Sequence, residues 1–315
     1  MSDHLIKKRQ DGRYYTEGNP FVLNPFLDWA ESISLNHKKV LEPFAGANNI
    51  IRALQSVGYA KNFSSYDILP SDPDVLYMNT ISDFPMGYDV CITNPPWLAK
   101  NSAHRRGLEY PETTYDDLYK HTLKLCLDNC ANVAALVPAT FLQSRLFLDR
   151  LNTVIFLHDR GMFSDTENPV CLTLFKEKSK DVEIFFDNKH VGRLSELNKM
   201  LPSPTLSNKD IVFNDPNGKL GFIAFDNTRE PSIKFCSGEE LSNYNIGFSS
   251  RMITRIGGDF GNVSKLVNNL NNRLAEFRNS TSDVFLTPFK GLRKDGMYRR
   301  RMDYGLARDF IANHA

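Results

Sequence analysis

The sequence predicts an α/β protein with a mostly parallel sheet, and three observations lead to this. Short apolar, strand-like segments alternate with helix-like segments over the first two-thirds of the chain, as in a sheet covered by helices on both faces. Several of these strand-like segments run directly into turn or polar residues, where open α/β sheets bind ligands. The 315 residues, 41% hydrophobic and 24% charged, suffice for a sizeable core and exclude wholesale disorder.

The individual elements follow from local sequence patterns. Short apolar runs bounded by turn residues predict strands at 39–42, 63–67, 75–78, 89–93, 133–137, 154–157 and 171–175. Apolar residues at helical spacing predict helices at 50–57, 115–130 and 141–151. The last two strands have a short connection, which predicts an antiparallel pair at the edge of the sheet.

The alternation stops near residue 190. Residues 200–250 are rich in Asn, Ser, Pro and Gly, with short apolar pieces such as 220–225, and only one helix is expected, at 263–277. We therefore divide the chain into two domains, residues 1–189 and residues 190–315. The fold of the second part does not follow from its sequence.

The net charge of +1 conceals an asymmetry between these two parts. Residues 1–189 hold 20 Lys+Arg against 24 Asp+Glu, whereas residues 190–315 hold 18 against 13. Seven basic residues and two acids lie within 285–308. A basic C-terminal part fits a polyanionic partner, and a solvated cationic tail is the alternative.

Several classes of protein are disfavoured. There is no run of about 18 apolar residues and no apolar segment near the N-terminus, so we expect neither a membrane span nor a signal peptide. The five cysteines are scattered without a CxxC pair, which predicts reduced core residues of a cytoplasmic protein and no metal site. No Walker-type glycine run is present, which argues against phosphate-cradling NTP chemistry.

The most informative motif is Asn94-Pro95-Pro96-Trp97, at the end of a predicted strand. Two prolines fix φ and remove N–H donors, so the loop is stiff and its carbonyls remain free to accept hydrogen bonds. A carboxamide oxygen and a backbone carbonyl can then hold one amino group, and Trp97 offers a flat face to a planar base. A plain Asn-Pro turn is the bland alternative.

A second set of residues suggests a nucleoside site. The segment Glu42-Pro43-Phe44-Ala45-Gly46 links a predicted strand to a helix, and Gly46 allows close approach of the backbone to a ligand. Asp67 ends the next predicted strand 21 residues later, the spacing at which an acid reaches ribose hydroxyls. Taken singly, a glycine turn and a strand-end Asp are common structural features.

In this order, the motifs resemble those of S-adenosylmethionine-dependent amino-methyltransferases, most closely the gamma-type DNA adenine-N6 methyltransferases, over about residues 10–190. The resemblance implies a Rossmann-like methyltransferase sheet and S-adenosyl-L-methionine as cofactor. It also implies that residues 1–189 form the cofactor-binding catalytic domain and residues 190–315 a DNA target-recognition region. The cofactor residues that it implies are Tyr15, Thr16, Glu42, Pro43, Phe44, Ala45, Gly46, Asp67 and Asn79. Those that it implies for catalysis are Asn94, Pro95, Pro96 and Trp97.

Three positions depart from the family pattern. Asn48 stands where the glycine loop usually has its second Gly. Asn79 lies nearest the position of an acid that reads the adenine amino group, with Asp83 as a neighbour. Glu17, instead of the commoner Pro, follows Thr16.

The resemblance also implies how a nucleic acid would bind. Phe163 matches an aromatic residue that supports a flipped base, and the loop at 100–112 would approach the substrate backbone. We expect contacts with phosphates and base edges from Arg105, Arg106, Arg293, Lys294, Arg299, Arg300 and Arg301. The expected partner is double-stranded DNA. A cognate restriction endonuclease is a second expected partner, but methyl transfer does not require it. We expect a monomer or weak dimer in the cytoplasm of a prokaryotic or phage-infected cell.

Other interpretations stay open. An RNA methyltransferase acting on adenine N6 or guanine N2 could share the four-residue motif. A protein-glutamine methyltransferase has a similar turn, although Tyr15-Thr16 and the basic C-terminal part argue against it, and cytosine-N4 methyltransferases more often carry Ser in place of the Asn. A non-enzymatic binding module is the last alternative, because Asn48 and Asn79 depart from the cofactor pattern.

Overall fold

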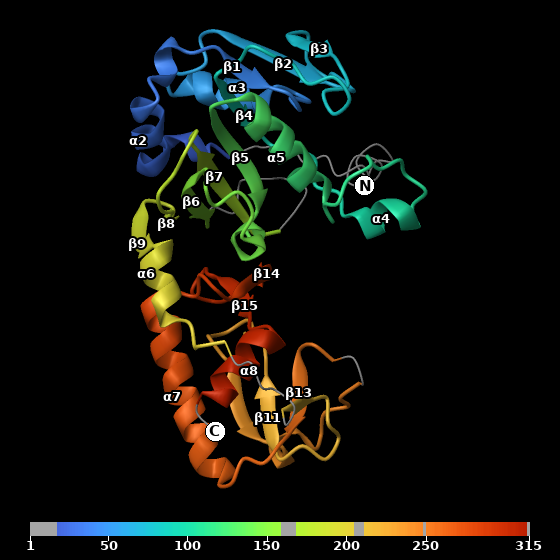
Figure 1. The fold of residues 1–315 in the computed structure, drawn as a ribbon, viewed down its shortest axis with the longest axis vertical. Helices are drawn as coiled ribbons and strands as arrows, with labels where there is room; N and C mark the ends of the chain where they lie inside the picture. Colours follow the sequence, from blue (N-terminus) through green and yellow to red (C-terminus); the bar gives the residue numbers. More distant parts are fainter. Residues whose placement is uncertain (1–17, 159–167, 205–210, 248–249, 314–315) are drawn as a thin grey trace. The chain divides into compact units, whose positions relative to one another are not determined.

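The computed structural model describes residues 18–158, 168–204, 211–247 and 250–313 (Figure 1). The chain divides into two compact units, unit 1 over residues 1–190 and unit 2 over residues 191–315. Within the described part of the chain, no helix is long and apolar enough to cross a membrane.

Unit 1 is built on a nine-stranded sheet with the order β3-β2-β1-β4-β5-β7-β6-β8-β9. The strands from β3 to β5 pair in parallel, β7 pairs antiparallel with both β5 and β6, and β8 is parallel to β6. Their bounds are Val40–Glu42 (β1), Phe63–Asp67 (β2), Val75–Tyr77 (β3), Val90–Thr93 (β4), Asn132–Pro138 (β5), Leu151–Leu157 (β6), Val170–Phe175 (β7), Glu183–Phe186 (β8) and Lys189–Arg193 (β9).

This sheet confirms the predicted α/β class, with a Rossmann-like, mostly parallel sheet and an antiparallel pairing of the last two predicted strands. The central strands β1 and β4 are buried at every residue, as apolar strands of a covered parallel sheet should be. Two strands that the sequence did not predict, β8 and β9, extend the sheet beyond the antiparallel pair.

The α-helices of unit 1 precede or connect these strands. They are α2 (Asn24–Ser32), α3 (Asn49–Ser56), α4 (Lys100–Arg105) and α5 (Leu118–Asn129), and the 3-10 helices are η1 (Pro20–Val22), η2 (Leu35–His37) and η3 (Phe141–Ser144). Helix α3 buries Ile50, Ile51 and Leu54.

The predicted helix over 141–151 is wrong. The chain makes only the 3-10 turn η3 there, because Arg145 and Phe147 adopt left-handed φ values of 53° and 55°, which a right-handed helix cannot contain. Strand β6 then begins at Leu151.

Unit 2 contains a four-stranded antiparallel sheet with the order β10-β13-β11-β12. Its strands are Val212–Phe213 (β10), Leu220–Ile223 (β11), Lys234–Ser237 (β12) and Ile253–Gly257 (β13), and a separate hairpin joins Thr287–Leu292 (β14) to Tyr298–Arg301 (β15). The helices are α6 (Leu194–Leu197), α7 (Val263–Thr281) and α8 (Tyr304–Ala312), with short 3-10 turns at Asn198–Met200 (η4) and Glu239–Leu241 (η5).

Helix α7 organises the core of unit 2. It begins where the sequence predicts, after the N-cap Asn262, whose side chain accepts a hydrogen bond from the backbone N–H of Lys265, and it runs on to Thr281. Leu266, Leu270 and Leu274 are buried at four-residue spacing and pack with residues of β11, β12 and α8 in one apolar cluster.

Candidate active site

The strand order reverses between β1 and β4. These strands are neighbours and parallel, yet the chain leaves β1 toward β2 and leaves β4 toward β5. Such a reversal of strand order is where open α/β sheets bind ligands. Both motifs singled out in the sequence leave the sheet here, the glycine turn after Glu42 and the Asn-Pro-Pro-Trp loop after Thr93.

The glycine turn contains two residues in the left-handed region. Gly46 has φ 51° and Asn48 has φ 61°. Asn tolerates this region better than other side chains, which explains how Asn48 replaces the second Gly of the family pattern. Its carboxamide oxygen accepts a hydrogen bond from the Ser65 hydroxyl at 2.8 Å, so the side chain also fastens the turn to β2.

Asp67, which the sequence analysis assigns to ribose hydroxyls, lies beside this turn. One carboxylate oxygen accepts a hydrogen bond from the backbone N–H of Gly46 at 2.8 Å, and the other accepts from Leu69 at 2.8 Å. A carboxylate oxygen can accept more than one hydrogen bond, so Asp67 retains capacity for a ligand hydroxyl.

Glu42 is fully buried between the two motifs. Its Oε1 accepts hydrogen bonds from the Thr93 hydroxyl at 2.6 Å and from the backbone N–H of Phe44 at 3.1 Å. Its Oε2 is buried and has no hydrogen-bond partner among the described residues. Burial, the dominant cause, raises the pKa of Glu42 to about 8, although the two hydrogen bonds act in the opposite direction.

Asn79 follows β3, and its side chain caps a turn. Its oxygen accepts a hydrogen bond from the backbone N–H of Ile81 at 3.3 Å. The next residue, Thr80, is buried and donates to the carbonyl of Pro43 at 2.7 Å, which ties this segment to the glycine turn.

Three exposed apolar side chains near Asp67 and Asn79 were missed by the sequence reasoning. Ile68, Leu69 and Tyr77 are 46%, 57% and 74% exposed. Large apolar side chains at the ends of neighbouring strands β2 and β3 offer contact area to a planar ligand. The signal in the sequence is the Ile-Leu pair that directly follows the strand-end Asp67.

The same region has an unusual charge pattern. Between Lys61 and Lys100 the sequence holds five Asp residues and no Lys, Arg or His, and we call residues 62–99 the cation-free stretch. Asp72 pairs with Arg52, and Asp89 pairs with Lys38. The other three Asp residues leave this stretch with a net negative charge, which suits a positively charged ligand better than an anion.

The Asn-Pro-Pro-Trp loop is held by contacts on its Trp side. Trp97 is only 8% exposed, and its indole N–H donates to the carbonyl of Leu136 on β5 at 3.3 Å. The flat face expected to meet a base is thus largely covered by protein. Asn94 is half-buried at the start of the loop.

Asp117 anchors the chain directly after this loop. Its Oδ1 accepts hydrogen bonds from the backbone N–H groups of Leu98 at 3.2 Å and Tyr119 at 3.4 Å, so one carboxylate caps α5 and holds the loop exit. Burial raises the pKa of Asp117 to about 6.

The segment after the loop carries two of the predicted substrate contacts. Arg105, at the end of α4, and Arg106 are exposed. Helix α4 is held in place by Ala103, which packs with Leu98 and Leu118 in a small apolar cluster. Tyr15, Thr16 and Phe163 lie outside the described residues.

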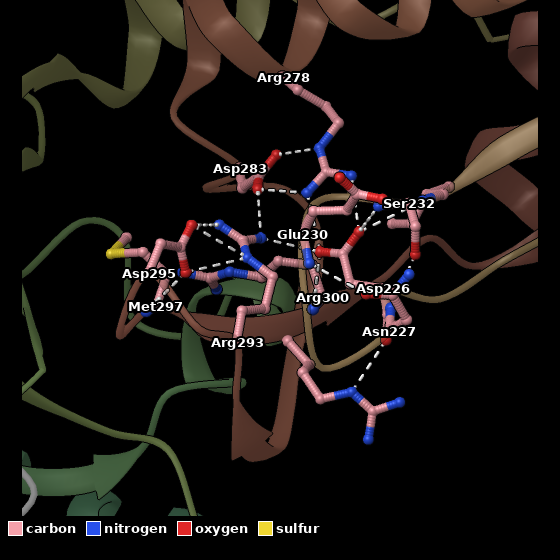
Figure 2. A network of polar contacts seen from close by, with 12 residues as sticks. Asp226, Asn227, Glu230, Ser232, Arg278, Asp283, Arg293, Asp295, Met297 and Arg300 are labelled. Atoms are coloured by element: carbon pink, nitrogen blue, oxygen red, sulfur yellow. Dashed lines mark hydrogen bonds and ion pairs between the residues drawn. The ribbon is translucent and has the colours of Figure 1, made fainter.

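Two of the predicted nucleic-acid contacts in unit 2 are corrected by the structure. Arg293 and Arg300 are 7% and 2% exposed. Arg293 donates to Asp226 at 2.9 Å and to Asp295 at 2.8 Å, within a buried network that also contains Arg278 and Asp283 (Figure 2). These two guanidinium groups belong to the interior of unit 2 and do not face a polyanion.

Asp226 is the centre of that network. Its side chain is fully buried and accepts a bidentate pair of hydrogen bonds from Arg278, both at 2.8 Å, besides the bond from Arg293 (Figure 2). Burial alone would raise the pKa of Asp226, but the hydrogen bonds and charge of Arg278 outweigh it and leave the pKa below its ordinary value.

The remaining predicted contacts of unit 2 are accessible. Lys294 is exposed, and Arg299 and Arg301 are half-buried on the same face of the β14–β15 hairpin. The Arg299 guanidinium lies 4.7 Å from the ring centre of Phe289 and 5.6 Å from that of Phe225, and its Nε donates to the carbonyl of Asp226 at 2.9 Å. This places a guanidinium between two aromatic rings with its terminal nitrogens unused by any hydrogen bond to the described residues.

Comparisons with known proteins give the following. Neither a protein-family model nor a curated protein sequence matches the chain. Among solved structures, a modification subunit of a candidate type I restriction enzyme from Vibrio vulnificus is similar at 17% identity over 55% of this chain and 47% of that one, with a TM-score of 0.38. A type I restriction-modification methyltransferase subunit from Streptococcus thermophilus is 16% identical over 60% and 52% of the two chains, with a TM-score of 0.37. A candidate RNA methyltransferase from Pyrococcus horikoshii is 15% identical over 55% and 91%, with a TM-score of 0.40. This chain thus spans about half the length of the two modification subunits.

Proposed function

We propose that the chain is an S-adenosylmethionine-dependent methyltransferase that acts on the N6 amino group of adenine in double-stranded DNA. The observation that carries the proposal is the placement of the Asn-Pro-Pro-Trp loop. It leaves β4 at the point of strand-order reversal, and the neighbouring strand β1 ends in Glu42 and the Gly46 turn. A nucleoside site and an amine-holding loop are therefore side by side.

The residues present fit the proposed cofactor. S-adenosylmethionine, when bound, supplies an electrophilic methyl group on a positively charged sulfur. Glu42, whose buried Oε2 has no partner among the described residues, suits the charged methionine end. Asp67 beside the Gly46 turn suits the ribose hydroxyls, and the exposed apolar side chains of Ile68 and Tyr77 suit the adenine ring.

The loop residues can activate the target amine. An exocyclic amine of adenine is a poor nucleophile, because its lone pair is delocalised into the ring. If the Asn94 side-chain oxygen and the Pro95 carbonyl accept its two hydrogens, the nitrogen becomes more tetrahedral and its lone pair turns toward the methyl group. Fixed positioning and acceptors aimed at the developing positive charge then lower the barrier. The amine gains the methyl group and loses one proton to water.

A base inside a duplex cannot reach this loop, so the target adenine must leave the stack. The cost of unstacking must be offset by contacts within the site. The Trp97 ring is largely covered by protein, so we assign it the role of fixing the loop through its hydrogen bond to the Leu136 carbonyl. We assign nucleic-acid contacts in unit 2 to Lys294, Arg299 and Arg301, and those near the loop to Arg105 and Arg106.

The test is transfer of labelled methyl from S-adenosylmethionine to duplex DNA and, in parallel, to total RNA, followed by nucleoside analysis. N6-methyladenine in DNA supports the proposal, and label in RNA alone moves the substrate to RNA. Asn94→Ala should abolish transfer and leave cofactor binding nearly intact, whereas Asn101→Ala, on the exposed helix α4, should retain both. Unchanged transfer by Asn94→Ala would exclude the assigned role.

A further inference from the structure

Glu42 joins the two halves of the candidate site through one carboxylate oxygen. Its Oε1 is held by the Thr93 hydroxyl, on the strand that leads to Asn94, and by the Phe44 N–H in the glycine turn. Two donors from different segments fix the orientation of the carboxyl group. The second oxygen remains buried, without a hydrogen-bond partner among the described residues.

The surroundings of Glu42 disfavour its charged form. Among the described residues, the charged group that acts on it is Asp67 at the end of β2, and a second carboxylate opposes ionisation. The contacts from β4 and from the turn come from a hydroxyl and a backbone N–H, which carry no net charge. The neighbouring cation-free stretch, residues 62–99, adds no Lys, Arg or His. A buried carboxylate in such a place requires a positive partner.

We propose that Glu42 is protonated in the empty site and ionised in the complex, so that binding of the cationic methyl donor releases a proton. The site then discriminates between the donor and its thioether product, which keeps the ammonium group but lacks the sulfonium charge. The inference rests on the proposed function, because the donor is S-adenosylmethionine. The proton passes to solvent, and no bond of the ligand changes. The pKa of Glu42, raised to about 8 by burial, agrees with a protonated carboxyl at neutral pH.

The experiment is titration calorimetry of the full chain at pH 7 with S-adenosylmethionine and with S-adenosylhomocysteine, in buffers of different ionisation enthalpy. We expect the donor to release close to one proton per site and the thioether product to release fewer. Between pH 7 and pH 9, the donor affinity of the wild type should rise about tenfold and then level off.

Glu42→Gln is the decisive variant, since its side-chain oxygen can still accept from Thr93 and Phe44 while the group cannot ionise. It should release no proton, lose the pH dependence and bind the two ligands with more similar affinities. Asp74→Asn, which removes an exposed acid of the same stretch, should behave as the wild type. Binding enthalpies that do not depend on the buffer, or equal proton release by Glu42→Gln, would overturn the inference.

The two proposals fail in different ways. If the chain binds neither ligand and transfers no methyl group, the proposed function fails. If it binds and transfers without proton release, only the role of Glu42 fails.

Discussion

The Asp117 carboxylate accepts a hydrogen bond from the backbone N–H of Leu98 at 3.2 Å, one residue beyond the Asn-Pro-Pro-Trp loop. The same oxygen caps α5 through Tyr119. The position of the loop therefore depends on helix α5, which begins at Leu118, 24 residues after Asn94 at the start of the loop.

This contact predicts a positioning role for Asp117. Asp117→Ala should lower kcat for methyl transfer about tenfold or more with little change in cofactor affinity, because the loop loses its anchor, and it should cost about 1 kcal/mol of stability as a lost N-cap. Asp117→Asn keeps the accepting oxygen and should restore most of the rate. Asp116→Ala is the matched control, since Asp116 is exposed and its carboxylate pairs with Lys120. Equal losses in Asp116→Ala and Asp117→Ala would contradict this role.

A second prediction concerns the stability of Glu42→Gln. The folded-state pKa of Glu42, about 8, lies above its ordinary value of 4.5, so the folded state binds a proton that the unfolded state releases. The contribution of this group is therefore most favourable below about pH 4.5 and is lost as the pH rises toward 8. Glu42→Gln cannot ionise, so its free energy of unfolding does not decrease in this way as the pH rises.

Urea unfolding at pH 5 and pH 8 measures the effect. The free energy of unfolding of Glu42→Gln, relative to the wild type, should increase by up to about 4 kcal/mol between these two pH values. A difference that stays constant with pH would show that Glu42 is ionised in the folded protein.

The buried network of unit 2 gives a third prediction. Asp226→Asn should destabilise the protein by about 3–5 kcal/mol, because Arg278 and Arg293 would lose the charge of the acid between them. Asp295→Asn should cost less than about 1 kcal/mol, since that side chain is 46% exposed. The pKa of Asp226 lies below its ordinary value, so its contribution persists at neutral pH and disappears only in strong acid. Thermal or urea unfolding of the two variants checks this, and similar losses would count against a central role for Asp226.

The fourth prediction separates charge from geometry at Arg299. Arg299→Lys keeps the charge but loses the bond to the Asp226 carbonyl and the planar guanidinium that lies over the rings of Phe225 and Phe289. It should weaken binding of a mixed-sequence DNA duplex about tenfold, whereas Arg301→Lys should change it less than about twofold. Fluorescence anisotropy at several salt concentrations should show an unchanged salt slope for Arg299→Lys and a slope smaller by about one for Arg299→Ala. If Arg299→Lys binds as tightly as the wild type, the pair of rings has no part in nucleic-acid binding.

The parallel part of unit 1 was predictable from the sequence, because its strands are short apolar runs that end in turn residues. The hydrogen bond from the Gly46 N–H to Asp67 was not predicted, because the 21-residue spacing indicated only an acid that reaches ribose hydroxyls. The 3-10 turn at 141–144 could not be predicted from the sequence. The left-handed residues that follow it, Arg145 and Phe147, are not Gly or Asn, the residue types that signal this conformation. Strand β9 was missed because, with its exposed Lys and His, it lacks apolar alternation. Strand β8, which is only four residues long, was also missed.

The roles of the basic residues in β15 could not be read from the sequence. Neighbouring residues of a strand face opposite sides, so Arg300 is buried opposite Pro288 while Arg299 and Arg301 share the other face. A run of three arginines hides this alternation. The acid that meets the buried side, Asp226, lies more than seventy residues earlier, and only the folded chain brings it to the backbone of Arg300.

The cation-free stretch has a consequence for the order in which the two proposed ligands load. The cationic cofactor interacts with only one or two carboxylates. A nucleic acid, in contrast, releases many condensed counterions when the protein binds it. Rising ionic strength therefore weakens nucleic-acid binding far more steeply than cofactor binding. The basic excess of the chain lies in residues 190–315, away in sequence from residues 62–99. At high ionic strength the resting form of the protein should therefore be loaded with cofactor and free of nucleic acid.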